Sequence, residues 1–432
     1  MIMDIERLYE LYRSSSGITT DSRSAGRNQI FFALRGPNHD GNRHAIAALE
    51  AGALAAVVDD RSLSGEKMVF VDDVLETLTA LAAFHRRRLT VPVIAVTGTN
   101  GKTTTKELLT AVLSRKGKVH STSGNLNNHI GVPLTLLSAP GDAMFLVVEM
   151  GANHRGEIAA LCDTAMPTHG IITNIGTAHI EGFGSFDNVR EAKSELYLWL
   201  GESRGTAIYD DDNPVLNGII SLAYKAVPYS SPAGHEMKVV PADGDSMHLA
   251  VNAVVDGHEY LFKTALFGSY NIDNIRTAMA TGLFFDVPVA EIIDAVSAYC
   301  PANNRSQVVD TGNNIVIRDA YNANPSSMEK AITSFAAIRS EKKMVILGDM
   351  LELGSESETG HAAVIRQLSG LGQVSIVLVG PRFRKAAGGF SSLLFGSSTE
   401  AAEWLGSERP RGYTVLVKGS RGMMLEKVFP LL

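Results

Sequence analysis

Cysteine is nearly absent from this chain of 432 residues, which contains only Cys162 and Cys300. Two thiols are too few for the disulfide framework of a small secreted domain, and too few for a thiolate metal centre. We therefore expect both cysteines to be buried free thiols in a protein of a reducing compartment.

Long apolar runs are missing as well. No stretch approaches the ~20 consecutive apolar residues that cross a bilayer. Residues 1–16 mix charges of both signs with spaced apolar residues, so they lack the apolar region of a signal peptide. We therefore expect a cytoplasmic protein that does not bind membranes.

An excess of positive charge is also missing. The chain has 39 basic and 46 acidic residues and a net charge of -7, which does not favour binding to a polyanion. Its 45% hydrophobic and 20% charged residues are typical of a globular protein. We therefore expect no nucleic-acid partner.

The length and the strand pattern predict an α/β protein of about three domains. A compact α/β unit covers residues 1–90. Its boundary is placed near residue 90 because Pro92 prevents the preceding helix from continuing. Residues 91–309 alternate short apolar strands with helices, which is typical of a parallel sheet, and include an antiparallel ribbon at 237–262. Residues 310–432 resume the alternation and predict a smaller, open third sheet. Its expected strands are 315–317, 344–347, 376–379 and 414–417.

A glycine-rich turn between a strand and a helix is the most informative local feature. The apolar strand at 93–96 leads into the turn, where Gly98 and Gly101 allow successive backbone N–H groups to point at phosphate oxygens. Lys102 can reach the terminal phosphates, and the Thr103 hydroxyl can bind Mg²⁺. The turn therefore predicts ATP or GTP binding.

The spacing of this turn departs from the usual phosphate loop, because Val96 stands where that pattern has its first glycine. An alternative interpretation is a glycine-containing turn with an exposed lysine. The Lys-Thr pair at the start of the helix favours nucleotide binding over that alternative. The loop by itself leaves the reaction open.

Several motifs, in one order along the chain, resemble those of a known family. The turn at 97–105 reads TGTNGKTTT, which resembles the phosphate loop of the Mur ligases, and the later motifs resemble those of the member that adds D-alanyl-D-alanine. They are GNLNNHIGVP at 124–133, EMGA at 149–152, GTAH at 176–179, DAYNANP at 319–325, LGDMLELG at 347–354 and VKGSRG at 417–422. The resemblance implies an N-terminal α/β domain for a uridine nucleotide, a central parallel-sheet ATPase domain and a C-terminal Rossmann-like domain.

The resemblance also implies a site for ATP and two Mg²⁺ ions. The ATP-binding residues it indicates are Gly98, Thr99, Asn100, Gly101, Lys102, Thr103, Thr104, Asn271, Asn274, Arg305 and Asp319. The metal ligands it indicates are Thr103, Glu149, His179 and Lys193, the last as a carbamate, and the catalytic residues are Lys102, Glu149, His179 and Lys193. An ammonium would repel Mg²⁺, whereas a neutral lysine amine can take up CO₂ and become an anionic oxygen ligand.

Several of these residues also have a plainer interpretation. Glu149 ends an apolar strand and could simply be solvated, His179 could be a solvated loop histidine, and Lys193 could be a surface lysine on a helix. Asn271 and Asn274 could cap a helix instead of contacting a nucleotide.

The organic substrates are expected at two further sets of residues. Asp21, Ser22 and Arg23 resemble the DSR motif of the first domain, which receives the uridine part of the substrate; a turn with a surface ion pair is the alternative. The other substrate-binding residues that the resemblance implies are Asn127, Asn128, Asn322, Asn324, Lys418, Ser420 and Arg421.

The resemblance implies an ATP-dependent ligase of peptidoglycan precursor synthesis. Such an enzyme activates the terminal carboxylate of UDP-N-acetylmuramoyl tripeptide as an acyl phosphate, joins it to D-alanyl-D-alanine, and releases ADP and phosphate. We expect a monomer that acts on these small molecules, and the third residue of the tripeptide stays open between diaminopimelate and lysine. The alternatives are a sister ligase that adds a single amino acid, a folylpolyglutamate synthetase-like ligase, a phosphate-loop motor or regulatory NTPase, and a non-catalytic nucleotide-binding scaffold.

Overall fold

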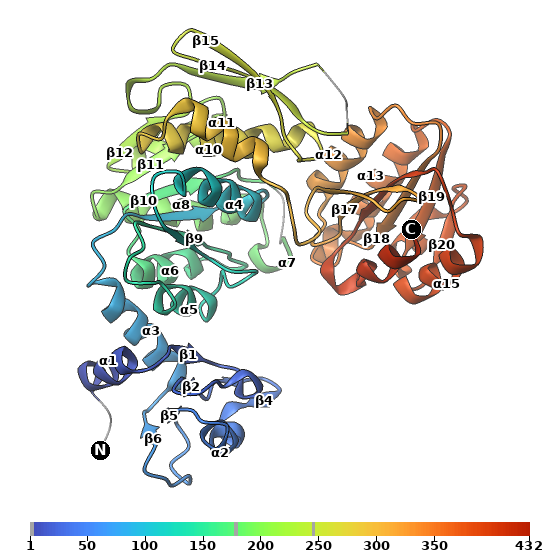
Figure 1. Cartoon of the computed structure of the whole chain (residues 1–432). Helices are drawn as coiled ribbons and strands as arrows, with labels where there is room; N and C mark the ends of the chain where they lie inside the picture. Colours follow the sequence, from blue (N-terminus) through green and yellow to red (C-terminus); the bar gives the residue numbers. More distant parts are fainter. Residues whose placement is uncertain (1–3, 177–179, 244–246) are drawn as a thin grey trace.

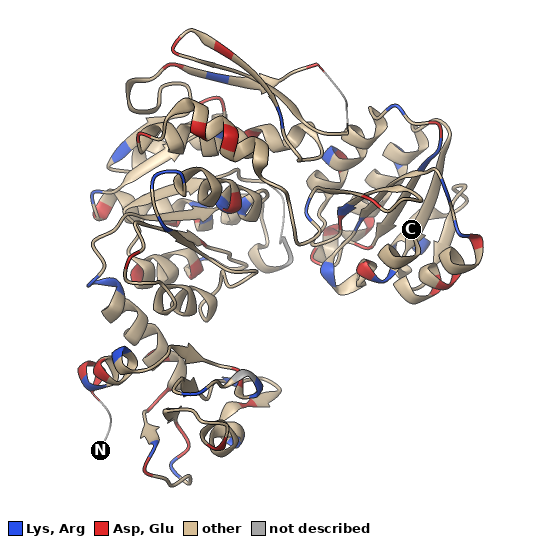
Figure 2. Cartoon of the chain, in the orientation of Figure 1, with Lys and Arg blue, Asp and Glu red and all other residues tan. Residues whose placement is uncertain are grey.

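The computed structural model describes residues 4–176, 180–243 and 247–432. Its strands form separate sheets that follow one another along the chain. Figure 1 shows the N-terminal part in blue below the central part, and the C-terminal part in orange and red to its side. Basic and acidic residues are distributed over all three parts (Figure 2). The mixed α/β fold class expected from the sequence is confirmed.

The N-terminal part is built on a four-stranded parallel sheet in the order β1-β2-β5-β6. All four residues of β5 are buried, as expected for an apolar strand covered on both faces. The elements are α1 (Ile5–Ser14), β1 (Ile18–Thr19), β2 (Ile30–Phe32), β3 (Arg35–Gly36), β4 (His39–Asp40), α2 (Ala45–Glu50), β5 (Ala55–Val58), β6 (Met68–Phe70) and α3 (Val74–Arg86).

Helix α3 connects this part to the centre of the molecule. It begins after Asp73, whose side chain accepts a hydrogen bond from the backbone N–H of Glu76 and so caps the helix. It ends at Arg86, whose buried guanidinium donates to the carbonyls of Ala165 and Met166 at 2.8 Å each. The end of α3 is thereby fixed to the central part.

The central part contains a six-stranded parallel sheet in the order β12-β11-β10-β7-β9-β8. Its strands are β7 (Val93–Thr97), β8 (Val119–Ser121), β9 (Phe145–Glu149), β10 (His169–Ile172), β11 (Thr206–Tyr209) and β12 (Lys225–Pro228). Its helices are α4 (Lys102–Leu113), α5 (Gly131–Leu137), α6 (Glu157–Ala165), α7 (Ile180–Phe183), α8 (Phe186–Glu202), α9 (Pro214–Asn217), α10 (Ile272–Phe284) and α11 (Val289–Ala298).

Strand β7 lies inside this sheet and is buried on both faces. Val93 and Ala95 belong to the core formed with α6 and α8, whereas Ile94 and Val96 belong to the core formed with α4 and α10. This alternation follows the two-residue period of a strand. Because β7 is parallel to its neighbours, its carboxyl end lies at the same edge of the sheet as theirs, and this is the edge where ligands bind in α/β folds.

An antiparallel ribbon covers one side of α10 and α11. It consists of β13 (Met237–Pro241), β14 (Ala250–Val255) and β15 (His258–Lys263), in that order. The ribbon expected at 237–262 is confirmed.

The C-terminal part contains a six-stranded sheet in the order β16-β17-β21-β18-β19-β20. Strand β16 is antiparallel to β17, and the other pairs are parallel. Its elements are β16 (Gln307–Asp310), β17 (Ile315–Asp319), α12 (Pro325–Ala336), β18 (Lys343–Gly348), α13 (Ser357–Ser369), β19 (Val374–Val379), α14 (Pro381–Ala387), β20 (Leu393–Phe395), α15 (Ser398–Glu408) and β21 (Thr414–Lys418). All four strands expected here are confirmed. The domain boundaries at 90/91 and 309/310 stay predictions, and β16 spans the second.

The two cysteines are both free, but they differ in exposure. Cys162 is buried in α6 and Cys300 is exposed. The expectation that both are buried is wrong for Cys300, because it lies beyond the end of α11, where its neighbours Tyr299 and Pro301 turn inward and Cys300 faces outward. No helix in the described ranges is long and apolar enough to cross a membrane.

His169 makes the stability of the fold depend on pH. Burial between Phe284 and Phe285, with a smaller contribution from Lys225, lowers the pKa of His169 from 6.5 to about 4. Below pH 6.5 the unfolded chain therefore binds a proton that the folded chain does not. Stability should fall by up to about 3 kcal/mol between pH 6.5 and about 4 through this residue.

Chemical denaturation at a series of pH values measures this effect. In His169→Leu, the free energy of unfolding should fall less steeply between pH 6.5 and 4 than in the native chain. Outside this window its dependence on pH should be unchanged. Equal slopes for the two proteins across this window would contradict the assignment.

Candidate active site

The turn after β7 is a curled loop that depends on its glycines. Gly98 and Gly101 have φ angles of +139° and +82°, which other residues rarely adopt. A Cβ on Gly98 would lie 2.1 Å from the Thr173 hydroxyl, and one on Gly101 would lie 2.4 Å from Oδ1 of Asn274. Both positions therefore require glycine, and the loop packs tightly against its neighbours.

Lys102 begins α4 and folds back over the loop. Its Nζ donates to the carbonyl oxygens of Gly98 at 2.7 Å and Thr99 at 3.1 Å. Burial lowers the pKa of Lys102, and the nearby carboxylate of Glu149 opposes that shift. Thr103 follows it in the chain and is buried as well. A cation at the start of a helix, among N–H groups, is an arrangement that can neutralise phosphate.

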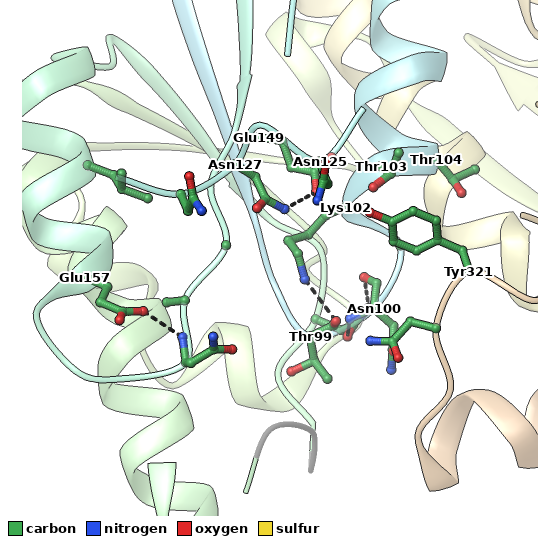
Figure 3. A pocket seen from close by; sticks show the side chains of 18 of the residues that line it. Thr99, Asn100, Lys102, Thr103, Thr104, Asn125, Asn127, Glu149, Glu157 and Tyr321 are labelled. Carbon is green, nitrogen blue, oxygen red and sulfur yellow. Dashed lines mark hydrogen bonds between the residues drawn. The ribbon is translucent and has the colours of Figure 1, made fainter. Parts of the chain in front are cut away.

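Glu149 ends β9 beside the loop, since it pairs in register with Val96 of β7. Its side chain is 2% exposed, so the interpretation as a solvated strand end is wrong. Oε1 accepts a hydrogen bond of 2.8 Å from Asn127 (Figure 3), whereas the buried Oε2 has no hydrogen-bond partner within the described residues. A buried carboxylate oxygen without a partner is costly. It fits a hard cation such as Mg²⁺.

Lys193 lies on the buried face of α8 and is 2% exposed, which excludes the surface-lysine interpretation. Burial, and secondarily repulsion from Lys102, lowers the pKa of Lys193 to about 7. Near neutral pH much of this amine is therefore uncharged, as CO₂ uptake requires. His179 lies outside the described residues.

Asn271 and Asn274 form a buried pair at the start of α10. Asn274 Nδ2 donates to Oδ1 of Asn271 at 2.8 Å, and its Oδ1 accepts from the Thr105 hydroxyl at 3.0 Å. Asn271 stands at the cap position but makes no side-chain cap bond to a described residue. The helix-cap alternative is therefore wrong for Asn271, and the pair instead fastens α10 to α4.

The C-terminal part contributes charged groups from the carboxyl ends of two neighbouring strands, β17 and β21. Asp319 accepts from Lys418 Nζ at 2.7 Å and from the backbone N–H of Ser306 at 3.0 Å. The Arg305 guanidinium lies 3.6 Å from the centre of the Tyr321 ring, and its buried Nε has no partner in the described part of the chain. Arg305 is thus held over an aromatic ring, and its Nε–H is left to donate to a ligand.

Most of these groups line one cavity of about 1060 Å³ between the central and C-terminal parts, whereas Gly98 and Lys193 are not among its lining residues. Figure 3 shows its wall, with Tyr321 across from Lys102. The predicted site residues that line it are Thr99, Asn100, Gly101, Lys102, Thr103, Thr104, Asn127, Asn128, Glu149, Asn271, Asn274, Arg305, Asp319, Asn322, Asn324 and Lys418.

Other predicted residues have local partners away from the cavity. Asp21 forms an exposed ion pair of 2.8 Å with Arg23, as in the surface-turn alternative, and its hydrogen bonds from Arg23 lower the pKa of Asp21 to about 2. Ser22 lies in the same turn. Ser420 accepts from the backbone N–H of Leu351. Substrate binding by these residues stays a prediction.

Two further predicted residues also bond to residues of their own part of the molecule: Arg421 in the C-terminal part and Asn128 in the central part. Arg421 contacts the Tyr321 hydroxyl at 3.4 Å. Asn128, although it lines the cavity, accepts bonds from the N–H groups of Ile130 and Gly131 at the start of α5. Their expected roles toward substrate are untested.

Several lining residues were not predicted as site residues from the sequence, among them Asn125, Glu157, Tyr321 and Glu352. Tyr321 and Glu352 stand a few residues after β17 and β18, at the edge where the other site residues lie. Their position behind a strand end is the feature that could have indicated them.

Comparisons with known proteins agree with this geometry. Residues 96–282 match the Mur ligase middle domain, and residues 304–421 match the Mur ligase glutamate ligase domain. The UDP-N-acetylmuramoyl-tripeptide--D-alanyl-D-alanine ligase of Bacillus subtilis is 34% identical over 95% of this chain and 92% of its own. The Escherichia coli ligase of the same name is 31% identical over 95% and 92%.

Solved structures show the same similarity. MurF from Acinetobacter baumannii superposes with a TM-score of 0.86 at 30% identity, covering 98% of this chain and 97% of its own. MurF from Thermotoga maritima, in complex with ADP, gives a TM-score of 0.83 at 25% identity over 98% and 97%. A folylpolyglutamate synthase from Thermotoga maritima is 14% identical and shares the fold, with a TM-score of 0.58 over 81% and 91%. On the strength of its phosphate loop, its cavity and these full-length relatives, the chain belongs to the Mur ligase family.

Proposed function

We propose that this chain joins D-alanyl-D-alanine to the terminal carboxylate of UDP-N-acetylmuramoyl tripeptide, with ATP as the energy source. The observation that carries the proposal is the shared cavity. There the phosphate loop and the Glu149 oxygen that has no hydrogen-bond partner among the described residues share a lining with Asp319 and Lys418 of another sheet. The full-length relatives that bear the name of this activity support it.

ATP would bind along the phosphate loop, with the Asn271–Asn274 pair and Arg305 at its sides. Thr103 and Glu149 would hold one Mg²⁺, and His179 with carbamylated Lys193 would hold a second. Mg²⁺, when bound, supplies positive charge that neutralises the phosphate oxygens. Two observations support these assignments: within the part of the chain that the structure describes, Oε2 of Glu149 has no hydrogen-bond partner, and the pKa of Lys193 is lowered.

The reaction needs activation because a carboxylate and an amine do not condense readily in water. The tripeptide carboxylate attacks the γ-phosphorus of ATP, ADP leaves, and an acyl phosphate forms. The dipeptide amine then attacks the acyl carbon, phosphate leaves, and the nitrogen loses a proton to give the amide. Lys102 stabilises the negative charge that develops on the phosphoryl oxygens during the first step.

The substrates would enter from opposite sides of the cavity. The uridine end lies toward Asp21, Ser22 and Arg23, and the dipeptide lies toward the C-terminal part. Asn322, Asn324 and Lys418, which line the cavity, and Ser420 and Arg421, which follow Lys418 in the chain, would face the dipeptide, and Asn127 and Asn128 of the central part would also contact substrate. We further propose that the chain acts as a monomer, and that it works in the cytoplasm, a reducing compartment with which its two free cysteines agree.

A phosphate-release assay tests the function. UDP-muramoyl tripeptides ending in diaminopimelate or in lysine are each supplied with ATP, with and without D-alanyl-D-alanine. We expect release that requires ATP, one of the tripeptides and the dipeptide together. Release with a single amino acid in place of the dipeptide would indicate a sister ligase, and release without organic substrates would indicate a simple NTPase.

A further inference from the structure

Asn100 of the phosphate loop is fixed to the central sheet through its backbone. Its N–H donates to Oδ1 of Asn174 at 3.0 Å. Its carbonyl accepts from Asn174 Nδ2 at 3.0 Å and from the Thr173 hydroxyl at 2.6 Å. Because Thr173 and Asn174 follow β10, these three bonds tie the backbone of Asn100 to the central part.

The side chain of Asn100 bonds in the other direction, to the start of α12. Its Oδ1 accepts from Asn324 Nδ2 at 2.8 Å, and its Nδ2 donates to the Ser326 hydroxyl at 3.0 Å, which in turn donates to Oδ1 of Asn324 at 3.0 Å. These three residues, which we call the clasp, form a closed ring of hydrogen bonds. The oxygen and the nitrogen of the Asn100 side-chain amide thus bond to residues that follow it by 224 and 226 positions in the chain.

The clasp is well suited to hold two rigid elements together. Asn324 also caps α12, since its Oδ1 accepts from the N–H of Ser327 at 2.9 Å. The ring therefore joins the phosphate loop directly to a helix end. Asn324 follows Asp319 of β17 by a short loop, so the ring sets the distance between the loop and the charged groups of the C-terminal part.

We propose that the clasp is a positioning device: Asn100 and Ser326 hold the C-terminal part against the phosphate loop while the amide forms. The inference rests on the proposed function. An acyl phosphate is hydrolysed by any water that reaches it, so the walls of the cavity must stay together until the amine attacks. Weakening the clasp therefore lets water compete with the amine.

Ser326→Ala tests this role because it removes two of the three bonds of the clasp, one of them between the phosphate loop and α12, and leaves the Asn324 cap in place. The measured quantity is the amount of phosphate released per peptide product, with both substrates and ATP present. For the native chain we expect a ratio of one. For Ser326→Ala we expect a ratio of about two or more, and a decrease of about three- to tenfold in kcat/KM for the dipeptide, because one of the two hydrogen bonds between the phosphate loop and α12 is lost.

Three further variants make the test selective. Thr333→Ala removes a similar bond on the same helix, where the hydroxyl accepts from Gln367 Nε2 at 3.0 Å, and should keep the ratio at one. Ser326→Thr keeps the hydroxyl and should restore the native ratio. Asn100→Ala removes both bonds from the loop side, and adding Ser326→Ala to it should change the ratio little further.

The inference is overturned if Ser326→Ala and Asn100→Ala both keep a ratio of one, or if Thr333→Ala raises it equally. A native chain that forms no amide product would instead overturn the proposed function, so the two failures are distinguishable.

Discussion

Lys102→Ala is expected to reduce ADP release that depends on both substrates by at least about a hundredfold. The ammonium of Lys102 is the cation that the loop places over its own carbonyls, at 2.7 Å and 3.1 Å. Without it, the charge that develops on the transferred phosphoryl group is left without a fixed positive partner. A coupled assay for ADP, run with saturating tripeptide and dipeptide, measures the change.

Lys116→Ala is a matched control for that experiment. Lys116 follows the end of the same helix, but it is exposed and pairs with Asp286 at 3.2 Å on the surface. Its removal should change the rate by less than about twofold. Turnover of Lys102→Ala at the level of this control would refute the assignment of the loop.

Glu149→Gln is expected to lower kcat by about a hundredfold and to shift the Mg²⁺ dependence to higher concentrations. The substitution keeps the size of the side chain, and its amide oxygen can still accept from Asn127 at the site of Oε1. It removes the negative charge from the buried oxygen that has no other partner among the described residues. Titration of activity with Mg²⁺ at fixed ATP measures both effects.

Glu259→Gln provides the corresponding control, because Glu259 bonds to Asn252 on the antiparallel ribbon, outside the cavity. It should retain the native Mg²⁺ dependence. If Glu149→Gln gave the same curve as this control, Glu149 would not be a metal ligand.

The sequence alone predicted those features that depend on neighbours along the chain. The apolar strand before Gly98 and the lysine at the start of α4 form a continuous segment, so spacing and residue type were enough. Glu149 was placed at the sheet edge by the same reasoning, since it ends an apolar run. The short strands β16 and β20 were missed because three or four residues carry little periodic pattern.

Features that join distant segments could not be read in this way. The bonds of Asn100 to Asn324 and Ser326 cross more than two hundred residues, and nothing local distinguishes them from turn residues. The stacking of Arg305 on Tyr321 likewise depends on how β17 meets the preceding loop. Tertiary packing alone brings such groups together.

Lys193 is an intermediate case, because the evidence for its burial was present in the sequence. It follows Val189 by four residues and precedes Tyr197 by four, and both are buried on α8. Residues at this spacing share one helix face. The lysine therefore lies on the core-facing stripe, and only the identity of its partners needed the structure.

The most direct measurement follows oxygen atoms from the tripeptide to phosphate. The terminal carboxylate of UDP-muramoyl tripeptide is labelled with the heavy oxygen isotope, and the phosphate released during ligation is analysed by mass. If the carboxylate attacks the γ-phosphorus in this cavity, each released phosphate carries one labelled oxygen. Phosphate without label, formed alongside amide product, would contradict carboxyl activation by phosphorylation.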